Sequence, residues 1–431
     1  MFRSSKFEFL IFAPERRILM QIEKTFRASD DILSDDEPLT GQYMILFALW
    51  MLVFSASSQL MIVVAMLPAI GEQLSISTSR QGLLVSSYAL MVGIFALVAG
   101  PISDKIGRRR MLLAGSGLMT AALALHAVVD SYAMLLIART LAGIAGGALS
   151  GAAVSYVGDY FPYERRGWAN GWVMSGIAVG QIAGVPLGAL LAEKFGFRTP
   201  FLIFAATMGA TFLLILKCVP QPNVQRDDRK LSISGALAEY LLLLKQKDIR
   251  VAASVFCLLF FSMALYITYL PAWLTECRKA TPSRIAALFF AGGIASVITS
   301  PIVGKMSDKL GRKPLILTSS VGLIVLMSGV TYVVQEFWLA FPVFFFSSVL
   351  LAARMSPFQA LLSALVPGNR RGALMSLTVA LGQVGFASGA ALAGIIYSQL
   401  DYRSSTFIGA GIALIVAWLI WRWLPEPGIQ K

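Results

Sequence analysis

Long apolar segments recur along the whole chain, and they constrain the fold more than any other feature of the sequence. Each approaches the roughly 20 residues that an α-helix needs to cross a hydrocarbon core about 30 Å thick. Because backbone polar groups find no water inside a bilayer, such segments must form helices, whose backbone hydrogen bonds are internal. Only 14% of the 431 residues are charged, against about 25% in soluble proteins. The sequence therefore predicts an all-α membrane protein.

Charged and Pro/Gly-rich breaks divide the apolar segments into twelve predicted transmembrane helices. Two of the breaks, 130–131 and 335–336, are so short that the helices they join must run antiparallel. The predicted spans are 43–68, 82–102, 111–129, 132–158, 168–192, 200–219, 251–274, 284–303, 315–334, 337–366, 373–399 and 404–424.

In a soluble protein the net charge of +13 would suggest a nucleic-acid partner. Here most of the 36 Lys and Arg residues fall in loops on one side of the predicted spans, together with both termini. Because cytoplasmic loops carry an excess of Lys and Arg, both termini are predicted to be cytoplasmic. We expect a multi-pass protein of a bacterial inner (plasma) membrane, in contact with the lipid bilayer and without a nucleic-acid partner.

The chain has five predicted parts. The first is predicted to be a disordered cytoplasmic extension, because it carries a long acidic stretch and lacks the cleavage site of a signal peptide. Whether Met1 or Met20 starts the protein stays open. Between the two halves, the amphipathic stretch 231–244 predicts a helix on the membrane surface. The parts are the extension 1–42, a six-helix bundle 43–220, a cytoplasmic linker 221–250, a second six-helix bundle 251–424 and a cytoplasmic tail 425–431.

Four short motifs occur twice, in the same order and at nearly the same spacing. The loop after the second span reads Gly-Pro-Ile-Ser-Asp-Lys-Ile-Gly-Arg-Arg from Gly100, and its counterpart reads Gly-Lys-Met-Ser-Asp-Lys-Leu-Gly-Arg-Lys from Gly304. The other pairs are Arg165-Arg166-Gly167 with Arg370-Arg371-Gly372, Gly180-Gln181 with Gly382-Gln383, and Phe197-Arg198 with Tyr402-Arg403. Two parallel six-helix repeats follow, with a substrate site expected between them near the membrane midplane.

At these motifs the sequence resembles the major facilitator superfamily, in particular its twelve-span drug/proton antiporter branch. The resemblance covers residues 43–424 and is most specific in the loop after the second span. Tyr88 and the pair Arg139 and Gly143 also match motifs of that branch, whereas Val185 splits the Gly-Pro pair usual in its fifth span. The resemblance implies two pseudo-symmetric bundles and a monomeric secondary transporter that works by alternating access without a cofactor.

Two sets of residues are predicted to control the conformational change. The resemblance implies that the repeated loop latches the cytoplasmic side closed, whereas a purely topogenic loop is the simpler alternative. The Asp104 carboxylate would pair with a nearby arginine, and Gly100 would let two helices approach closely. Small residues spaced by four in the fifth span form a face for packing or bending. The latch residues are Gly100, Asp104, Gly107, Arg108, Gly304, Asp308, Gly311 and Arg312, and the hinge residues are Gly176, Gly180, Gly184, Pro186 and Gly188.

Two arginines, Arg139 and Arg354, lie inside predicted spans, where a charged side chain is costly and is a functional candidate by default. No carboxylate lies deep in a predicted span, which favours an anionic or zwitterionic substrate over a lipophilic cation. Packing is the alternative role for both arginines. The predicted cavity residues are Gln59, Tyr88, Arg139, Gln181, Tyr266, Tyr269, Arg354, Gln359 and Gln383. Glu276, Arg139 and His126 are the candidates for coupling to protons.

The favoured hypothesis is a proton-coupled antiporter that exports small organic compounds, as in multidrug or metabolite efflux. An importer or exchanger of organic anions without proton coupling is the alternative, and a transporter-like sensor or membrane enzyme is a hypothesis of another class. We expect neither an enzyme nor a metal site, since the sequence has no phosphate-binding glycine loop and no His/Cys ligand cluster.

Overall fold

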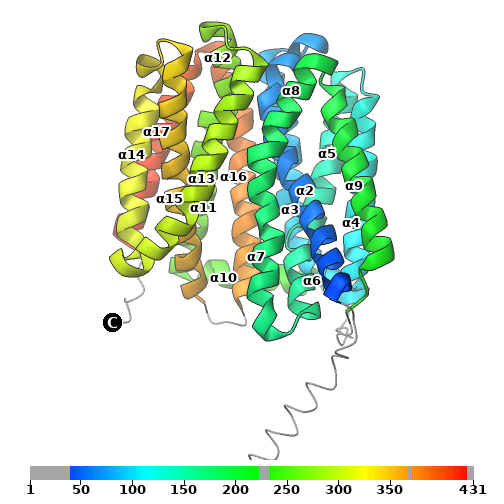
Figure 1. The fold of residues 1–431 in the computed structure, drawn as a ribbon. Coiled ribbons are helices and arrows are strands. Elements are labelled where there is room, and N and C mark those ends of the chain that lie inside the picture. The colour runs from blue at the N-terminus through cyan, green and yellow to red at the C-terminus, as the bar shows by residue number, and fades with distance from the viewer. Residues whose placement is uncertain (1–38, 223–232, 367–369, 425–431) are drawn as a thin grey trace, which may run out of the picture. The chain divides into compact units, whose positions relative to one another are not determined.

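The computed structural model describes residues 39–222, 233–366 and 370–424. Contacts divide the chain into two compact units, Met1–Ile45 and Leu46–Lys431. The described residues form helices and no strand, in agreement with the predicted fold class (Figure 1).

Twelve spans of the described chain are long and apolar enough to cross a bilayer, which confirms the predicted number. Several of them consist of two or three successive helical pieces. The first six spans are α2 (Leu39–Gln73), α3 (Thr78–Ile106), α4 (Arg108–Ala127), α5 (Tyr132–Leu149) with α6 (Ala152–Tyr160), α7 (Tyr163–Val179) with η1 (Gly180–Gly184) and α8 (Val185–Phe195), and α9 (Arg198–Cys218). The last six are α11 (Lys247–Ile267) with α12 (Leu270–Arg278), α13 (Pro282–Leu310), α14 (Arg312–Val333), η2 (Phe337–Leu339) with α15 (Ala340–Ala364), α16 (Arg371–Gln399) and α17 (Tyr402–Trp423).

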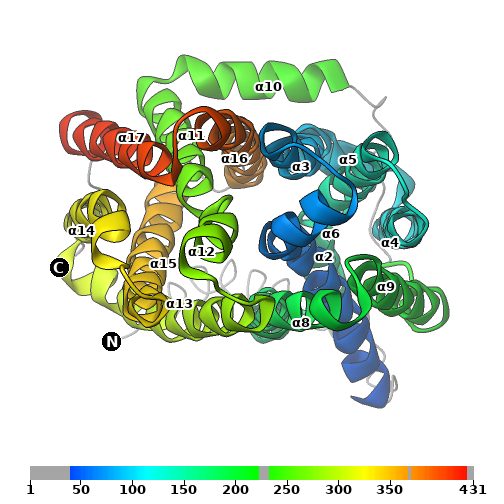
Figure 2. The ribbon, with the colours of Figure 1, turned by 90° about the horizontal axis from the view of Figure 1, so that it is seen from above.

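The spans form two six-helix bundles, α2 to α9 and α11 to α17, which confirms the predicted pseudo-symmetric halves. Figure 2, seen from above, places α3 beside α16 and α8 beside α13, and these pairs make close contacts between the halves. Small residues allow the close approach: a Cβ at Gly82 of α3 would collide with the Ala390 carbonyl of α16.

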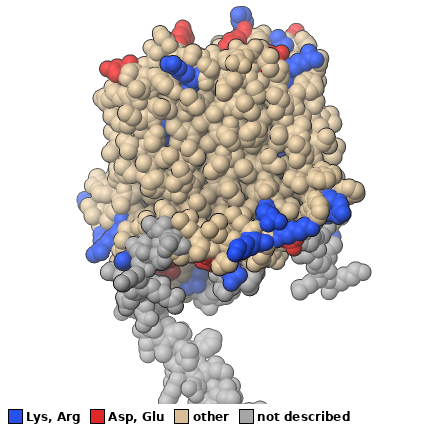
Figure 3. Space-filling model, turned by 180° about the vertical axis from the view of Figure 1, so that it is seen from behind, with Lys and Arg blue, Asp and Glu red and all other residues tan. Residues whose placement is uncertain are grey.

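We name the two ends of the bundles after the helix that lies at each end. Helix α12, at the top of Figure 1, marks the α12 face, and α10 (Ile233–Lys245), at the bottom, marks the α10 face. Figure 3 shows charged side chains at both ends and an uncharged band between them. Large apolar side chains at the middle of spans are exposed, among them Leu213, Val325 and Leu414. Such a band is what contact with lipid requires, because hydrocarbon cannot solvate charges.

Helix α10 lies at the α10 face and contacts both halves. The Tyr240 hydroxyl donates a hydrogen bond to the Leu97 carbonyl of α3, 3.0 Å away. Leu243 packs in one cluster with Leu377 of α16. The helix thus occupies the stretch of the linker for which a surface helix was predicted. The exact domain boundaries stay predictions, and the tail 425–431 and most of the extension 1–42 lie outside the described residues.

Candidate functional site

A cavity of about 110 Å³ lies between the two halves and is lined by residues from within the spans. Its lining is uncharged and mostly apolar, and its polar side chains are Gln181, Ser296 and Ser348. Of the predicted cavity residues, Gln181 lies here. The other lining residues are Met61 and Val185 from the first half, and Met263, Ile267, Phe289, Gly292, Gly293, Phe344 and Leu351 from the second.

Hydrogen bonds join the halves near the α12 face. Tyr269, between α11 and α12, donates its hydroxyl proton to the Thr78 carbonyl at the start of α3, 2.6 Å away. Further along α3, the Ser86 hydroxyl donates to the Ala387 carbonyl of α16 at 2.6 Å. Only glycine fits at position 394, since a Cβ there would lie 2.8 Å from the Tyr269 hydroxyl. The contact between α3 and α16 is therefore tight toward the α12 face.

A second contact between the halves joins the fifth span to α13. At the α12 face the Ser283 hydroxyl donates to the Glu193 carboxylate. Deeper in the membrane, Gly293 of α13 meets the η1 segment, where its Cβ would lie 3.1 Å from the Ile182 Cα. Both contacts close the central cavity toward the same face.

Glu276 is linked to this closure through two aromatic rings. Its carboxylate accepts a hydrogen bond from the Tyr397 hydroxyl at 2.6 Å. The Tyr397 ring stacks on the Tyr269 ring with centroids 5.0 Å apart, and Tyr269 binds the opposite half at Thr78. A change in the Glu276 charge can therefore reach the contact between the halves through side chains that touch one another.

Arg139 of α5 is fully buried in the first half and does not line the central cavity. Its Nε donates to the Leu84 carbonyl and its Nη1 to the Gln59 carbonyl, both at 3.2 Å. The guanidinium lies over the Tyr88 ring, 4.3 Å from the centroid. Backbone oxygens and a ring face thus solvate the charge, and Arg139 ties α2 and α3 to α5.

Arg354 of α15 is also buried, with its Nη2 donating to the Leu259 carbonyl of α11 at 3.4 Å. Tyr266 is buried on the same span as Leu259 and shares a 3.0 Å hydrogen bond with Ser347. Neither Arg354 nor Tyr266 lines the central cavity. In this conformation both side chains join helices of the second half.

His126 of α4 is fully buried, with Nδ1 2.7 Å from the Ala122 carbonyl and its ring stacked on Phe201 at 4.3 Å. Gln59 is buried as well, and its Nε2 donates to the Ser55 carbonyl at 3.4 Å. The His126 Nε2 and the Gln59 Oε1 have no partner among the described residues.

The two other predicted glutamines lie outside the central cavity. Gln383 of α16 is half-buried, and its Cβ packs against the position of Gly93 on α3. Gln359 of α15 is exposed. The central cavity is therefore lined by only one glutamine of the repeated pair, Gln181.

The loop motif after the second span forms a compact ion-pair cluster. Arg108 contacts the Asp104 carboxylate through Nη2 and the Asp159 carboxylate through Nε, both at 2.6 Å. Gly107 ends α3 with a φ of +97°, a conformation that favours glycine. Asp104 thus pairs with an arginine of the loop, and the cluster ties the loop to the end of the fourth span.

The role expected for Gly100 was wrong in this structure. Among the described residues, no atom of another helix lies within 4 Å of a Cβ built at Gly100, so it does not mediate close helix packing there. In the second copy of the loop, Gly311 repeats the positive φ at +91°, and Gly304 would bring a Cβ to 3.3 Å from the Ser356 Oγ. Arg312 donates to the Ala360 carbonyl at 2.9 Å, while the Asp308 side chain lies outside the described part.

The glycine face of the fifth span packs against α2. A Cβ at Gly176 would lie 2.8 Å from the Trp50 carbonyl oxygen, and one at Gly180 would lie 2.9 Å from the Phe54 carbonyl oxygen. Gly184 and Gly188 meet side chains of the same helix. The span widens into the π-helix η1 between Gly180 and Gly184, just before Pro186. π-Helical turns often occur at functional sites, and this one borders the central cavity.

Sequence reasoning missed the apolar side of the cavity and much of the contact between the halves. Phe289, Phe344 and Ser348 carry no motif, and nothing in their local sequence separates them from lipid-facing residues. The paired glycines Gly292 and Gly293 gave the one usable signal, because adjacent glycines in an apolar helix indicate close approach of another backbone.

The fold and the paired loop motifs agree with a family model that describes the Major Facilitator Superfamily and matches residues 49–278 and 252–431. The chain belongs to this superfamily. Both halves are matched, as expected for two repeats of one fold. The family and the geometry are those of a membrane transporter and not of an enzyme.

Individual relatives and a solved structure support the same assignment. The multidrug resistance protein MdtG of Proteus mirabilis is 26% identical over 394 residues, covering 88% of this chain and 96% of that protein. An uncharacterized MFS-type transporter of Bacillus subtilis, YceJ, is 24% identical over 374 residues, covering 85% and 92%. The crystal structure of a D-xylose–proton symporter has the same fold, with a TM-score of 0.74, 18% identity and coverage of 90% and 99%.

Proposed function

We propose that this transporter exports small amphipathic organic compounds from the cytoplasm by alternating access, driven by protons. The uncharged cavity between the halves carries the proposal. Its methionine, phenylalanine and isoleucine side chains suit apolar groups of varied shape, because Met and aromatic side chains adapt to different ligands. Gln181, Ser296 and Ser348 supply hydrogen bonds without selecting a charge. The multidrug name of the relative MdtG agrees with such a cavity.

The organic-anion alternative depended on Arg139 and Arg354. Both guanidinium groups are engaged by backbone carbonyls inside one half, away from the central cavity. An anion in this cavity would meet no positive side chain. The export of uncharged or weakly charged compounds is therefore the better-supported proposal.

Orientation and coupling belong to the same proposal. The excess of Lys and Arg in loops on the side of α10 supports a cytoplasmic α10 face. The structure then represents a state closed to the outside. Glu276 lies on the outer side next to the Tyr397–Tyr269 contact, where it would take up a proton from the external medium.

Transport by purified protein in proteoliposomes tests this function. We expect an imposed pH gradient to drive the flux of an uncharged amphipathic dye at least tenfold faster than that of an anionic dye of similar size, and a protonophore to abolish it. Ser296→Phe should fill the central cavity and block the flux, whereas Ser388→Phe, at an exposed position of α16, should not. Preference for the anion, or transport that survives without the gradient, would reject the proposal.

A further inference from the structure

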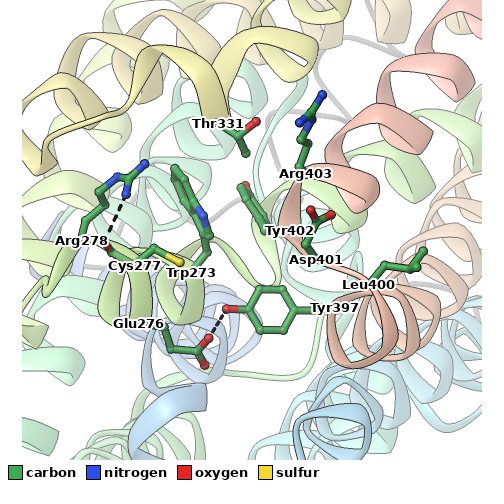
Figure 4. A pocket seen from close by; sticks show the side chains of 10 residues that line it. All are labelled: Trp273, Glu276, Cys277, Arg278, Thr331, Tyr397, Leu400, Asp401, Tyr402 and Arg403. Carbon is green, nitrogen blue, oxygen red and sulfur yellow. Dashed lines mark hydrogen bonds between the residues drawn. The ribbon is translucent and has the colours of Figure 1, made fainter.

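A second pocket, of about 390 Å³, opens at the α12 face within the second half, apart from the central cavity; it shares Glu276 with the proposed proton coupling (Figure 4). Its walls come from α12, the end of α14, the end of α16 and the start of α17. We name it the α12 pocket. It is lined chiefly by Trp273, Glu276, Arg278, Tyr397, Asp401 and Arg403. The volume lies within the range of roughly 300–1,000 Å³ that small-molecule sites occupy.

The α12 pocket holds two carboxylates and two guanidinium groups, yet no ion pair joins them; the described ion pairs both involve Arg108. One oxygen of Glu276 accepts the Tyr397 hydroxyl, and one oxygen of Asp401 accepts the Ser404 N–H at the start of α17, each at 2.6 Å. Each carboxylate therefore keeps a second oxygen for another partner.

The repeat in the sequence explains why Arg403 is available. Its counterpart in the first half, Arg198, donates Nε and Nη2 to the Val129 carbonyl beyond α4, at 2.8 and 2.5 Å. In the second half the carbonyl that follows α14, that of Val334, accepts instead from Arg278 Nε at 2.7 Å. Arg278 thus makes the bond that holds the loop, and the Arg403 guanidinium has no hydrogen-bond partner among the described residues.

Arg403 is nevertheless held in place. Its guanidinium lies over the Tyr332 ring, 4.4 Å from the centroid, so the edges with their N–H donors stay free. A stacked guanidinium with free donors is well suited to bind a carboxylate through two parallel hydrogen bonds. The preceding positions also differ between the repeats, because Asp401 stands where the first half has Gly196. The first half adopts the same fold with Gly196 in place of Asp401, so the fold itself does not require a carboxylate next to the arginine.

We propose that the α12 pocket binds a small zwitterion of the amino-acid type with an apolar side chain. Arg403 holds its carboxylate, and Asp401 with Glu276 receives its ammonium group. The apolar side chain packs on the aromatic wall, in which Trp273 stacks on Tyr402 at 4.9 Å. Thr331, whose buried hydroxyl has no partner among the described residues, lines the same pocket. Because this pocket lies apart from the central cavity, the proposal does not depend on the proposed substrate.

Equilibrium binding to the full chain in lipid nanodiscs tests the site, with tritiated L-phenylalanine as the probe. We expect saturable binding that unlabelled L-phenylalanine displaces at concentrations at least tenfold lower than two analogues of the same skeleton need. The analogues are 3-phenylpropionate, which lacks the ammonium group, and 2-phenylethylamine, which lacks the carboxylate.

The repeat supplies matched variants. Arg403→Gln should weaken L-phenylalanine binding at least tenfold and leave the melting temperature unchanged. Arg198→Gln should lower the melting temperature and leave the affinity unchanged, because that arginine holds the Val129 loop. Asp401→Asn keeps the oxygen that caps α17 and removes the charge, so it should also weaken binding.

Labelling of the exposed residue Cys277 tests whether the ligand binds in the α12 pocket, because Cys277 lines this pocket. In a chain with Cys218→Ser and Cys257→Ser, L-phenylalanine should protect Cys277 from N-ethylmaleimide at the concentrations at which it binds. Absence of saturable binding, equal competition by either single-charge analogue, parental affinity in Arg403→Gln, or binding that leaves Cys277 unprotected would each overturn the proposal.

Discussion

Arg139 is fully buried although its side chain is positively charged, and its neighbours explain how the first half tolerates the charge. Two backbone carbonyls on two different helices accept its protons, and the Tyr88 ring covers one face. This geometry needs the divergent N–H groups and flat face of a guanidinium, which an ammonium group lacks.

Arg139→Lys is therefore expected to destabilise the protein although the charge is kept. One of the two hydrogen bonds from the charged side chain, to the Leu84 or the Gln59 carbonyl, would be lost, at a cost of about 1.5–3 kcal/mol. Thermal unfolding in nanodiscs would measure the loss as a lower melting temperature. Arg80→Lys, at an exposed position of the same half, is the control and should change little. An unchanged melting temperature for Arg139→Lys would contradict the tethering role.

Asp104→Asn should separate a latch from a merely structural loop. Its ion pair with Arg108 is half exposed, with 51% of the Asp104 side chain accessible, so stability should change by less than about 1 kcal/mol. As a latch residue, Asp104 should still lower the transport rate at least tenfold. The matched control is Asp130→Asn, another exposed carboxylate outside the cluster. Parental transport in Asp104→Asn would leave only the topogenic role.

The sequence predicted which charged residues lie within the membrane spans, but it did not predict their hydrogen-bond partners. The pattern identified Arg139 and Arg354 as charges within spans, yet their main acceptors are backbone carbonyls of distant helices. Every residue has a carbonyl, so no local sequence marks the one that will accept. For the same reason the sequence did not predict the hydrogen bond from Arg278 to the Val334 carbonyl. Because Arg278 makes this bond, Arg403 does not.

The fifth span departs from a regular α-helix. Its glycines bring α2 within backbone contact, and η1 adds a π-helical turn beside the cavity. Close backbone contact favours sliding and bending of this span, whereas a larger side chain would separate the two helices.

Gly180→Ala should slow transport at least fivefold and lower the melting temperature. The added Cβ would lie 2.5 Å from the Ser57 Oγ and 2.9 Å from the Phe54 carbonyl oxygen, so α2 must shift. Gly171→Ala is the matched control on the same span, because no atom lies within 4 Å of its Cβ. That control should be neutral or gain up to about 1 kcal/mol from helix propensity. Similar effects of both substitutions would show that helix packing at Gly180 is unimportant.

Hydropathy predicted all twelve spans because lipid imposes both length and composition on them. It did not predict where spans break. The interruption between α11 and α12, which presents Tyr269 to Thr78, and the π turn in the fifth span depend on hydrogen bonds and packing that leave hydropathy unchanged.

At the scale of the whole molecule, the two halves meet through α3 with α16 and through the fifth span with α13. The hydrogen bonds of Tyr269, Ser86 and Ser283 between the halves all lie toward the α12 face. Alternating access requires these bonds to break while each half stays intact. The ion pairs of Arg108 lie within one half in this structure.

A reversible cross-link across the α12 face tests this most directly. Glu193→Cys with Ser283→Cys places thiols on two side chains that touch across the halves, in a chain whose native cysteines are replaced. Arg80→Cys with Tyr132→Cys places a similar pair within the first half. We predict that a short bifunctional thiol reagent stops transport in the first pair, that reduction restores it, and that the second pair transports throughout. Full transport with the Glu193–Ser283 link intact would contradict alternating access between the halves.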